Sequence, residues 1–367
     1  MRRVIALAGD GLLKVLLIGD YPPPYGGISV QIQNLQYRIR QLPEFTCTAL
    51  NIGASRKTRN PECLEAPNAI SFLRTLGSYA RQHYILHIIT NGHNLKSWLC
   101  AFACSAFGLL NRRRTIIALD SGAMADFVTK AGWPLRVLIS ITLRLAGAII
   151  CRNQKGREVL LRLGSRADRT VVLPGYFPSD PSNLEAISPE IKAFISSRQP
   201  IIGTIVAFRP EYRTEMLLTA IQELAQHYPS IGLIIIGSGG DDGIIFNNSQ
   251  RVMVVRDVPH PICLAIMSRL SVFARCTDYD GDAISVREAL SLGIPVVASD
   301  TDFRPDGVVK FRIGDSEGLT KAIRSVLSPQ KRGEDLCFDD YDPSEAVLKV
   351  YRGLLKRKDI LTMSRTQ

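Results

Sequence analysis

Residues 280–299 read DGDAISVREALSLGIPVVAS, and the rest of the chain is arranged around this stretch. It begins as a loop with two carboxylates, continues as a short helix that Gly293 ends, and finishes in an apolar, β-branched run typical of a buried strand. The start of such a helix presents free backbone N–H groups and a positive dipole end, which suit a phosphate. A structural alternative is a capping box, in which Glu288 and Ser285 satisfy the helix's own first amides. On this stretch alone, the capping box is the better interpretation.

Strand-like and helix-like segments alternate along the whole chain. In the first half, strands are expected at 14–19, 46–52, 84–89, 115–119, 148–151 and 170–173, and helices at 28–40, 71–82, 95–110, 135–145 and 155–163. In the second half, strands are expected at 201–206, 232–236, 252–255 and 271–274, and helices at 215–227, 261–269, 318–327 and 344–358. Strands separated by helices of this length predict an α/β protein with two Rossmann-like, doubly wound parallel sheets.

The predicted domain boundaries follow from composition. Residues 174–189 are rich in Pro, Ser and Asp, which is typical of an interdomain linker. We therefore expect an N-terminal Rossmann-like domain at 1–175, a linker at 176–199 and a C-terminal Rossmann-like domain at 200–342. Residues 343–367 are expected to form a C-terminal helix and tail that cross back to the N-terminal domain. A ligand cleft is expected between the two domains.

Bulk composition excludes several classes of protein. The 367 residues are 46% hydrophobic, as in ordinary globular proteins, and they include eight scattered cysteines without a C-x-x-C pair. Reduced cysteines of this kind predict a cytoplasmic protein. Cys100 and Cys104 share a helix face but lack further ligands nearby in sequence, so core packing is favoured over metal binding. No secretion signal or membrane-spanning segment is expected.

The excess of positive charge lies entirely in the first half of the chain. Residues 1–175 hold 23 Lys and Arg against 9 Asp and Glu, whereas residues 176–367 hold 22 against 25. Such asymmetry indicates an acidic partner for the first half, although basic surfaces also serve solubility. The apolar helix at 98–110 is read mainly as buried core. The adjacent Arg112, Arg113 and Arg114, with Arg136 and Arg144 on the next helix, fit docking on anionic headgroups.

Candidate binding residues follow the predicted strands, because ligands of doubly wound sheets bind at the carboxyl ends of the strands. The arginines and amides of the second half suit a diphosphate. Asp280 and Glu288 can accept hydrogen bonds from sugar hydroxyls, so the combination favours a nucleotide-sugar. His87 lies inside an apolar strand and is read as a packed core residue. The strand-end candidates are Gly26, Gly27, His93, Asp120 and Ser121 in the first half, and Arg209, Arg213, Gly237 and Ala283 in the second.

Three segments carry a resemblance to a known family. Residues 280–299 resemble the E-x7-E segment and following strand of family-4 glycosyltransferases of the GT-B fold. Residues 18–27 resemble the Gly-Gly loop of that family, and 206–209 stand where it has an arginine for the donor phosphate. The resemblance extends from about Lys14 to about Leu355. It implies retaining transfer of a sugar from a UDP- or GDP-sugar to a saccharide or lipid-linked acceptor, without metal or cofactor, in cell-surface polysaccharide or glycolipid synthesis.

The resemblance also implies roles for single residues. Glu288 would hold the donor ribose, and Asp280 would take the place of the first family glutamate beside the sugar. Arg209 would neutralise the leaving diphosphate. Asp120 stands where the family often has a histidine near the acceptor. The implied catalytic set is Asp280, Glu288, Arg209 and Asp120; the implied donor set is Gly26, Gly27, Arg209, Arg213, Gly237, Ala283, Ile284, Ser285 and Glu288; and the acceptor-side set is His93, Asp120 and Ser121.

Departures from the family pattern keep other functions open. Asp280 is one methylene shorter than glutamate, and Tyr212 stands where many members have a lysine. These changes, with Asp120, motivate a catalytically degenerate nucleotide-sugar-binding protein as the alternative. A sugar-nucleotide epimerase on the same fold would need positioned acid and base groups that the sequence does not reveal. A nucleic-acid binder is disfavoured, because the arginines are not interleaved with aromatic residues on a known module. A transferase would act in the cytoplasm, at the inner face of the plasma membrane.

Overall fold

The computed structural model describes residues 12–57, 59–110, 115–175, 184–238, 250–328 and 343–356. The chain divides into two compact units. The first contains Met1–Pro22, Ile28–Phe177 and Pro343–Gln367, and the second contains Pro23–Gly27 and Pro178–Asp342. None of the helices in the described ranges is long and apolar enough to cross a membrane.

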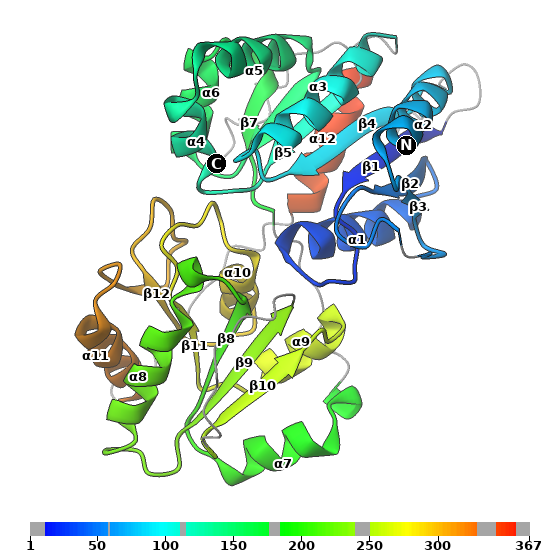
Figure 1. The fold of residues 1–367 in the computed structure, drawn as a ribbon. Coiled ribbons are helices and arrows are strands. Elements are labelled where there is room, and N and C mark those ends of the chain that lie inside the picture. Colours follow the sequence, from blue (N-terminus) through cyan, green and yellow to red (C-terminus); the bar gives the residue numbers. More distant parts are fainter. Residues whose placement is uncertain are drawn as a thin grey trace, which may run out of the picture. The chain divides into compact units, whose positions relative to one another are not determined.

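The first unit is built on a parallel sheet of seven strands (Figure 1). The strand order is β3-β2-β1-β4-β5-β6-β7, so the chain changes direction across the sheet between β1 and β4. The strands are β1 (Leu13–Gly19), β2 (Phe45–Asn51), β3 (Leu64–Glu65), β4 (Ile85–Thr90), β5 (Thr115–Leu119), β6 (Ala148–Cys151) and β7 (Thr170–Val172). The helices are α1 (Gly27–Arg40), α2 (Ala69–Arg81), α3 (Leu95–Leu110), α4 (Met124–Lys130), α5 (Trp133–Leu145), α6 (Gln154–Arg162) and α12 (Pro343–Lys356).

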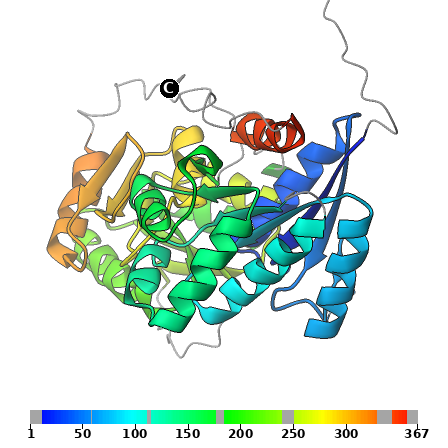
Figure 2. The same ribbon diagram turned by 90° about the horizontal axis from the view of Figure 1, so that it is seen from above.

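Each face of this sheet has its own hydrophobic core. Because side chains alternate along a strand, Leu16 and Ile18 of β1 face one core while Val15 and Leu17 face the other. Helices α2, α3 and α5 cover the first face, and α1 and α12 cover the second. Figure 2 shows α12 beside the strands and α1 of this unit, although they are far apart in sequence. The fully buried Tyr351 anchors α12 to the sheet.

His87 is a buried core residue of β4, as the sequence predicts. Its Nδ1 lies 2.7 Å from the hydroxyl oxygen of Tyr351, and its Nε2 has no hydrogen-bond partner among the described residues. Burial, reinforced by the charge of Arg152, lowers the pKa of His87 from 6.5 to about 3. The imidazole is therefore neutral in the folded protein at neutral pH.

This buried histidine predicts a stability loss in mild acid. Between pH 6.5 and about pH 3, His87 is protonated in the unfolded chain but neutral in the folded protein. Stability should therefore fall by as much as ~1.4 kcal/mol per pH unit within that window. Urea unfolding of the native protein and of His87→Gln between pH 7 and pH 4.5 measures the effect. In the variant, the free energy of unfolding should fall less steeply as the pH is lowered. An equal pH dependence of this free energy in the two proteins would contradict the prediction.

The second unit is built on a parallel sheet of six strands in the order β10-β9-β8-β11-β12-β13. The strands are β8 (Ile201–Ala207), β9 (Gly232–Ser238), β10 (Val252–Arg256), β11 (Val272–Arg275), β12 (Val296–Ser299) and β13 (Val308–Phe311). The α-helices are α7 (Pro189–Ser197), α8 (Thr214–Leu224), α9 (His260–Met267), α10 (Ile284–Ser291) and α11 (Ser316–Leu327). The predicted fold class, with two doubly wound parallel sheets, is confirmed.

Some elements differ from the sequence prediction. Helix α7 lies within the range predicted as linker, because Ser188 caps it by accepting a hydrogen bond from Ile191 N–H and Pro189 is its first residue. The Ser-Pro pair read as a linker is thus a helix start. Helix α4 and strands β3 and β13 were also not predicted. They are short, with seven, two and four residues, so they leave little periodicity in the sequence.

Candidate functional site

The amino end of α10 is open in the way that an anion site requires. Its N-cap residue, Ala283, has extended backbone, and no side chain caps the helix. The N–H groups of Val286 and Arg287 bond to the carbonyl of Ala283 at 3.1 and 3.3 Å. Within the described residues, the N–H groups of Ile284 and Ser285 have no such partner. Two amides and the positive dipole end are therefore available to a ligand.

The capping-box interpretation of this helix is wrong. Ser285 is the second residue of α10 rather than its N-cap, and no side chain satisfies the first amides. Glu288 instead contacts His260, the first residue of α9, with 2.6 Å between Oε1 and Nε2. Both side chains are buried. Among the described residues Glu288 Oε2 makes no hydrogen bond, so one oxygen is fixed by the protein and the other remains for a ligand.

Asp280 is held by two buried arginines. Arg275, the last residue of β11, donates to Oδ1 from Nη2 at 2.9 Å and to Oδ2 from Nε at 3.1 Å. Arg304 donates to Oδ2 at 2.8 Å, and the Thr277 hydroxyl donates to the same oxygen at 2.7 Å. Burial alone would raise the pKa of Asp280, but the two guanidiniums outweigh it and hold that pKa well below its usual range. The carboxylate is thus permanently ionised and largely satisfied by the protein itself.

The two arginines connect Asp280 to the rest of the sheet. Arg275 also donates to the carbonyl of Ile205 in β8 at 2.8 Å and lies over the ring of Tyr212. Arg304 donates to the carbonyl of Ser299, where β12 ends, at 2.9 Å. The carboxyl ends of β8, β11 and β12 are therefore bridged through one carboxylate. This network fixes the loop that leads into α10.

The other donor-side candidates differ in whether contacts within the protein already occupy them. Arg209, directly after Phe208, is 66% exposed and only 4.0 Å from the Glu211 carboxylate. Arg213 has left-handed backbone and donates from Nε to Asp278, so its guanidinium is already paired. At Gly237, a Cβ would collide with the ring of Phe208. Gly237 is therefore required by packing, whereas Arg209 is the cation best placed to turn toward a ligand.

The remaining glycine candidates are placed as follows. Gly26 and Gly27 are grouped with the second unit, and a Cβ at Gly26 would meet no atom within 4 Å. The turn at 237–240 continues outside the described residues. Arg112, Arg113 and Arg114 also lie outside them.

Two acceptor-side candidates lie together at the carboxyl ends of β4 and β5. His93 Nδ1 is 2.8 Å from Ser121 Oγ. Asp120 is the third candidate, and it accepts from Arg152 Nε at 2.6 Å. Arg152, which follows β6, also donates to the carbonyl of Leu173 at 2.9 Å. Asp120 is thus a paired carboxylate that ties neighbouring strand ends together.

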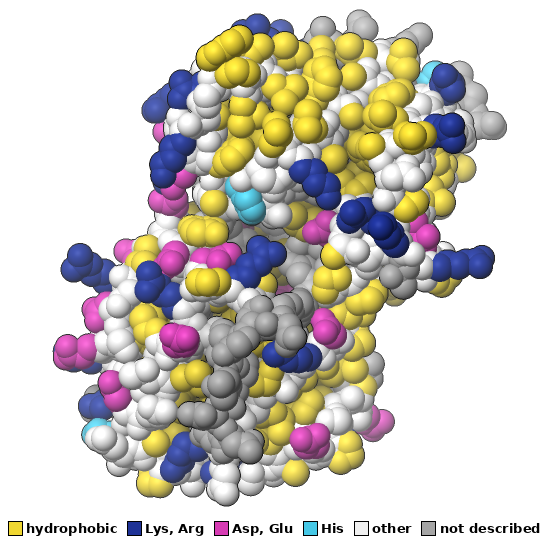
Figure 3. Space-filling view, in the orientation of Figure 1, with side chains coloured by type: hydrophobic (Ala, Val, Ile, Leu, Met, Phe, Trp, Pro, Cys, Tyr) yellow, Lys and Arg dark blue, Asp and Glu magenta, His cyan; other side chains and the backbone are white. Residues whose placement is uncertain are grey.

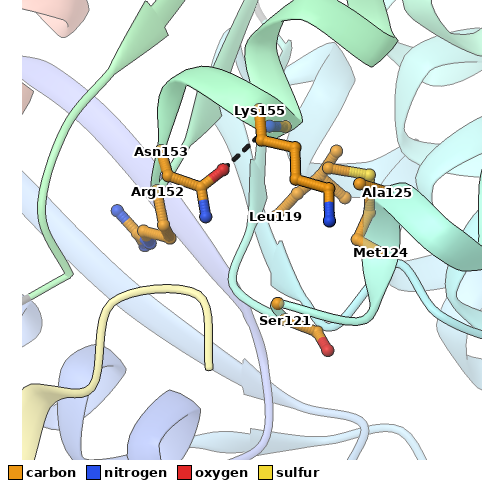
Figure 4. Close-up of a pocket in the computed structure, with 9 residues that line it drawn as sticks. Leu119, Ser121, Met124, Ala125, Arg152, Asn153 and Lys155 are labelled. Carbon is orange, nitrogen blue, oxygen red and sulfur yellow. Dashed lines mark hydrogen bonds between the residues drawn. The ribbon is translucent and has the colours of Figure 1, made fainter. Parts of the chain in front are cut away.

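A pocket opens beside this group in the first unit. Its volume is about 260 Å³, including space open to solvent. Figure 4 shows Lys155 and Asn153 over the pocket, with the loop of Ser121 below them. Asn153 caps α6 by accepting from Gly156 N–H at 2.8 Å. The lining residues are Leu119, Ser121, Gly122, Met124, Ala125, Arg152, Asn153, Lys155 and Gly156.

Sequence reasoning missed the residues that hold the candidates in place. These are His260 beside Glu288, Arg275 and Arg304 beside Asp280, and Arg152 beside Asp120. His260 begins α9, Arg275 ends β11 and Arg152 follows β6, but the residues were not paired with their partners by any local sequence pattern. Within the described residues, no cluster of three or more His, Cys, Asp or Glu could hold a metal ion.

Most of the second unit matches a known protein family. Residues 199–329, which contain all the second-unit groups described above except Gly26 and Gly27, match the family described as glycosyl transferases group 1. This segment is therefore similar to group 1 glycosyltransferases. The match confirms the family resemblance seen in residues 206–209 and 280–299. A search of curated protein sequences finds no match.

Solved structures with the same two-sheet architecture cover nearly the whole chain. Anabaena HepE in complex with UDP-glucose is 16% identical, with a TM-score of 0.63 over 96% of this chain and 97% of that one. Sucrose-phosphate synthase from Thermosynechococcus elongatus is 15% identical, with a TM-score of 0.62 over 96% and 98%. The S. aureus MnaA–UDP structure is 13% identical, with a TM-score of 0.64 over 94% and 97%. These similarities show that the chain has the GT-B fold.

Proposed function

We propose that the chain is a retaining glycosyltransferase that moves a sugar from a UDP- or GDP-sugar to a hydroxyl of a saccharide or lipid-linked acceptor. The observation that carries the proposal is the open end of α10 beside Glu288. Two free amides suit a diphosphate, and the free oxygen of Glu288 suits a ribose hydroxyl. The match of residues 199–329 to group 1 glycosyltransferases supports the same chemistry.

In the proposed reaction, the bond between the anomeric carbon and the diphosphate oxygen breaks, and the acceptor oxygen bonds to the same carbon. The acceptor proton leaves with the departing diphosphate, so no strong protein base is needed. The amides of Ile284 and Ser285 and the guanidinium of Arg209 would stabilise the charge that develops on the leaving diphosphate. The acceptor would be aligned by the His93–Ser121 pair of the first unit. We place the acceptor in cell-surface polysaccharide or glycolipid synthesis, at the cytoplasmic face of the membrane.

Arg209 provides the first test of this proposal. Arg209→Ala should weaken nucleoside diphosphate binding about tenfold, because one charge-assisted hydrogen bond is worth about 1.5–3 kcal/mol and this side chain is largely exposed. Calorimetric titration with UDP and GDP measures the loss. Arg312→Ala is the matched control, since it removes an exposed arginine from the same unit. No binding of either nucleotide to the native protein would overturn the proposal, and equal binding by the two variants would remove Arg209 from it.

One specific observation favours a second candidate, a nucleotide-sugar-binding protein without turnover. Asp280 and Asp120, two of the expected catalytic carboxylates, are both paired with buried arginines. A binding protein of this kind would bind the donor but transfer nothing. Donor hydrolysis and transfer assays with membrane extracts as the acceptor source separate the two candidates, since only the transferase releases the nucleoside diphosphate.

A further inference from the structure

Helix α3 exposes apolar side chains on its solvent side as well as burying an inner side. The residues that it buries are Ser97, Trp98, Ala101, Cys104, Ser105 and Gly108, and the Ser105 hydroxyl has no hydrogen-bond partner among the described residues. Its solvent side carries Leu99 and Leu110, which are 50% and 65% exposed. A helix on the surface of a globular protein normally carries polar and charged residues on its solvent side. The outer side of α3 therefore has a composition suited to an apolar environment.

Helix α5, which packs against α3, continues the same surface. Trp133, Val137 and Ile141 follow one another at intervals of four residues, so they form one stripe along the helix. They are 78%, 48% and 42% exposed. Figure 3 shows hydrophobic side chains gathered over this part of the first unit, with Lys and Arg toward the margins. Exposed apolar surface of this extent, rimmed by charge, marks an interaction site.

The charges on these helices are of one sign. Neither α3 nor α5 contains an Asp or Glu, and neither does α2, which packs against α3. The basic residues of the three helices are Arg74, Arg81, Lys96, Arg136 and Arg144. Apolar side chains beside basic ones, without acidic ones, are complementary to an anionic lipid surface. A protein partner would have to be both apolar and acidic over the same area.

From these observations we infer that the outer faces of α3 and α5 form a docking surface for an anionic lipid bilayer. Trp133 and the leucines enter the interface between headgroups and acyl chains, and the arginines contact the headgroup phosphates. The inference extends the proposed function, because a lipid-linked acceptor is met at such a surface. It does not use the donor site, so its test is independent of nucleotide binding.

Flotation of the full-length protein with vesicles tests the docking surface. The native protein should float with vesicles of phosphatidylglycerol and phosphatidylcholine, more weakly at high salt, and least with phosphatidylcholine alone. Trp133→Glu with Val137→Glu should reduce binding at least tenfold, because two apolar contacts are lost and two charges face the headgroups. Tyr37→Glu is the matched control. Tyr37 is 67% exposed on α1, outside the docking surface, so this variant should float like the native protein.

The following outcomes would overturn the inference. Native protein that stays unbound to anionic vesicles refutes it, and so does a Trp133/Val137 variant that floats as well as the native protein. Size-exclusion chromatography covers the remaining case. If the native protein is a dimer that binds no vesicles and the variant is a monomer, a second copy covers this face instead. UDP or GDP binding, measured on the same variants, should be unchanged. A negative result in the vesicle test would therefore not contradict the proposed transferase activity.

Discussion

Replacing Asp280 with alanine should lower the free energy of unfolding by about 3–5 kcal/mol, because the change leaves two buried guanidiniums without their counterion. Arg275 and Arg304 have only 10% and 1% of their side-chain surface exposed. Neither can turn to water without disturbing the ends of β8 and β12. Urea unfolding at pH 7 measures the effect. A fall of this size would identify Asp280 chiefly as a structural residue of the loop before α10.

The control for this experiment is an ion pair at the surface of the same unit. Asp300 lies 3.2 Å from Lys310, and both side chains are about half exposed. Asp300→Ala should therefore cost less than about 1 kcal/mol. The decisive contrary result is an Asp280→Ala protein that unfolds at the native urea concentration but has lost sugar transfer. Asp280 would then act on the bound sugar, as the family resemblance implies, and the arginine pairs would contribute little to stability.

The fold could be predicted from the sequence because its signals are local and repeated. The apolar runs that become β1, β4, β5, β8 and β9 are buried on both faces, so they appear in the sequence as continuous hydrophobic segments. Helix α3 was predicted with both of its ends, Leu95 and Leu110. The order of the strands within each sheet, by contrast, depends on contacts between distant segments that no periodicity records.

The candidate site could be predicted only in outline. The helix start near Ala283 was predicted, and its amino end is open because Ala283 cannot cap a helix with its side chain, although the stretch alone favoured a capping box. The partner of Glu288 could not be predicted, because His260 lies 28 residues away and enters only through the packing of α9. The same holds for Arg304, 24 residues from Asp280. Sequence spacing gave a capping role to Glu288, and tertiary contact with His260 replaced it.

Replacing Glu288 with alanine should weaken nucleoside diphosphate binding about 100-fold or more, if its free oxygen holds the ribose hydroxyls. Hydrogen bonds to a charged acceptor contribute about 1.5–3 kcal/mol each, and a ribose offers two hydroxyls. The change should also remove the preference for a ribonucleotide. The native protein should bind UDP or GDP more tightly than the 2′-deoxy form of the same nucleotide, and the variant should bind both equally. Calorimetric titration with the two nucleotides measures both effects.

His260 should influence the same preference through Glu288. Its ring nitrogen holds Oε1 at 2.6 Å, so Oε2 is kept in one position. In His260→Ala, the Glu288 carboxylate is no longer fixed, and we expect about a tenfold loss of nucleotide affinity with a reduced ribose preference. Glu317→Ala is the matched control, because it removes an exposed carboxylate of α11 in the same unit and should change neither quantity. A loss of affinity that is equal for ribo- and deoxyribonucleotides would mean that the His260–Glu288 pair only supports packing of α9 on α10.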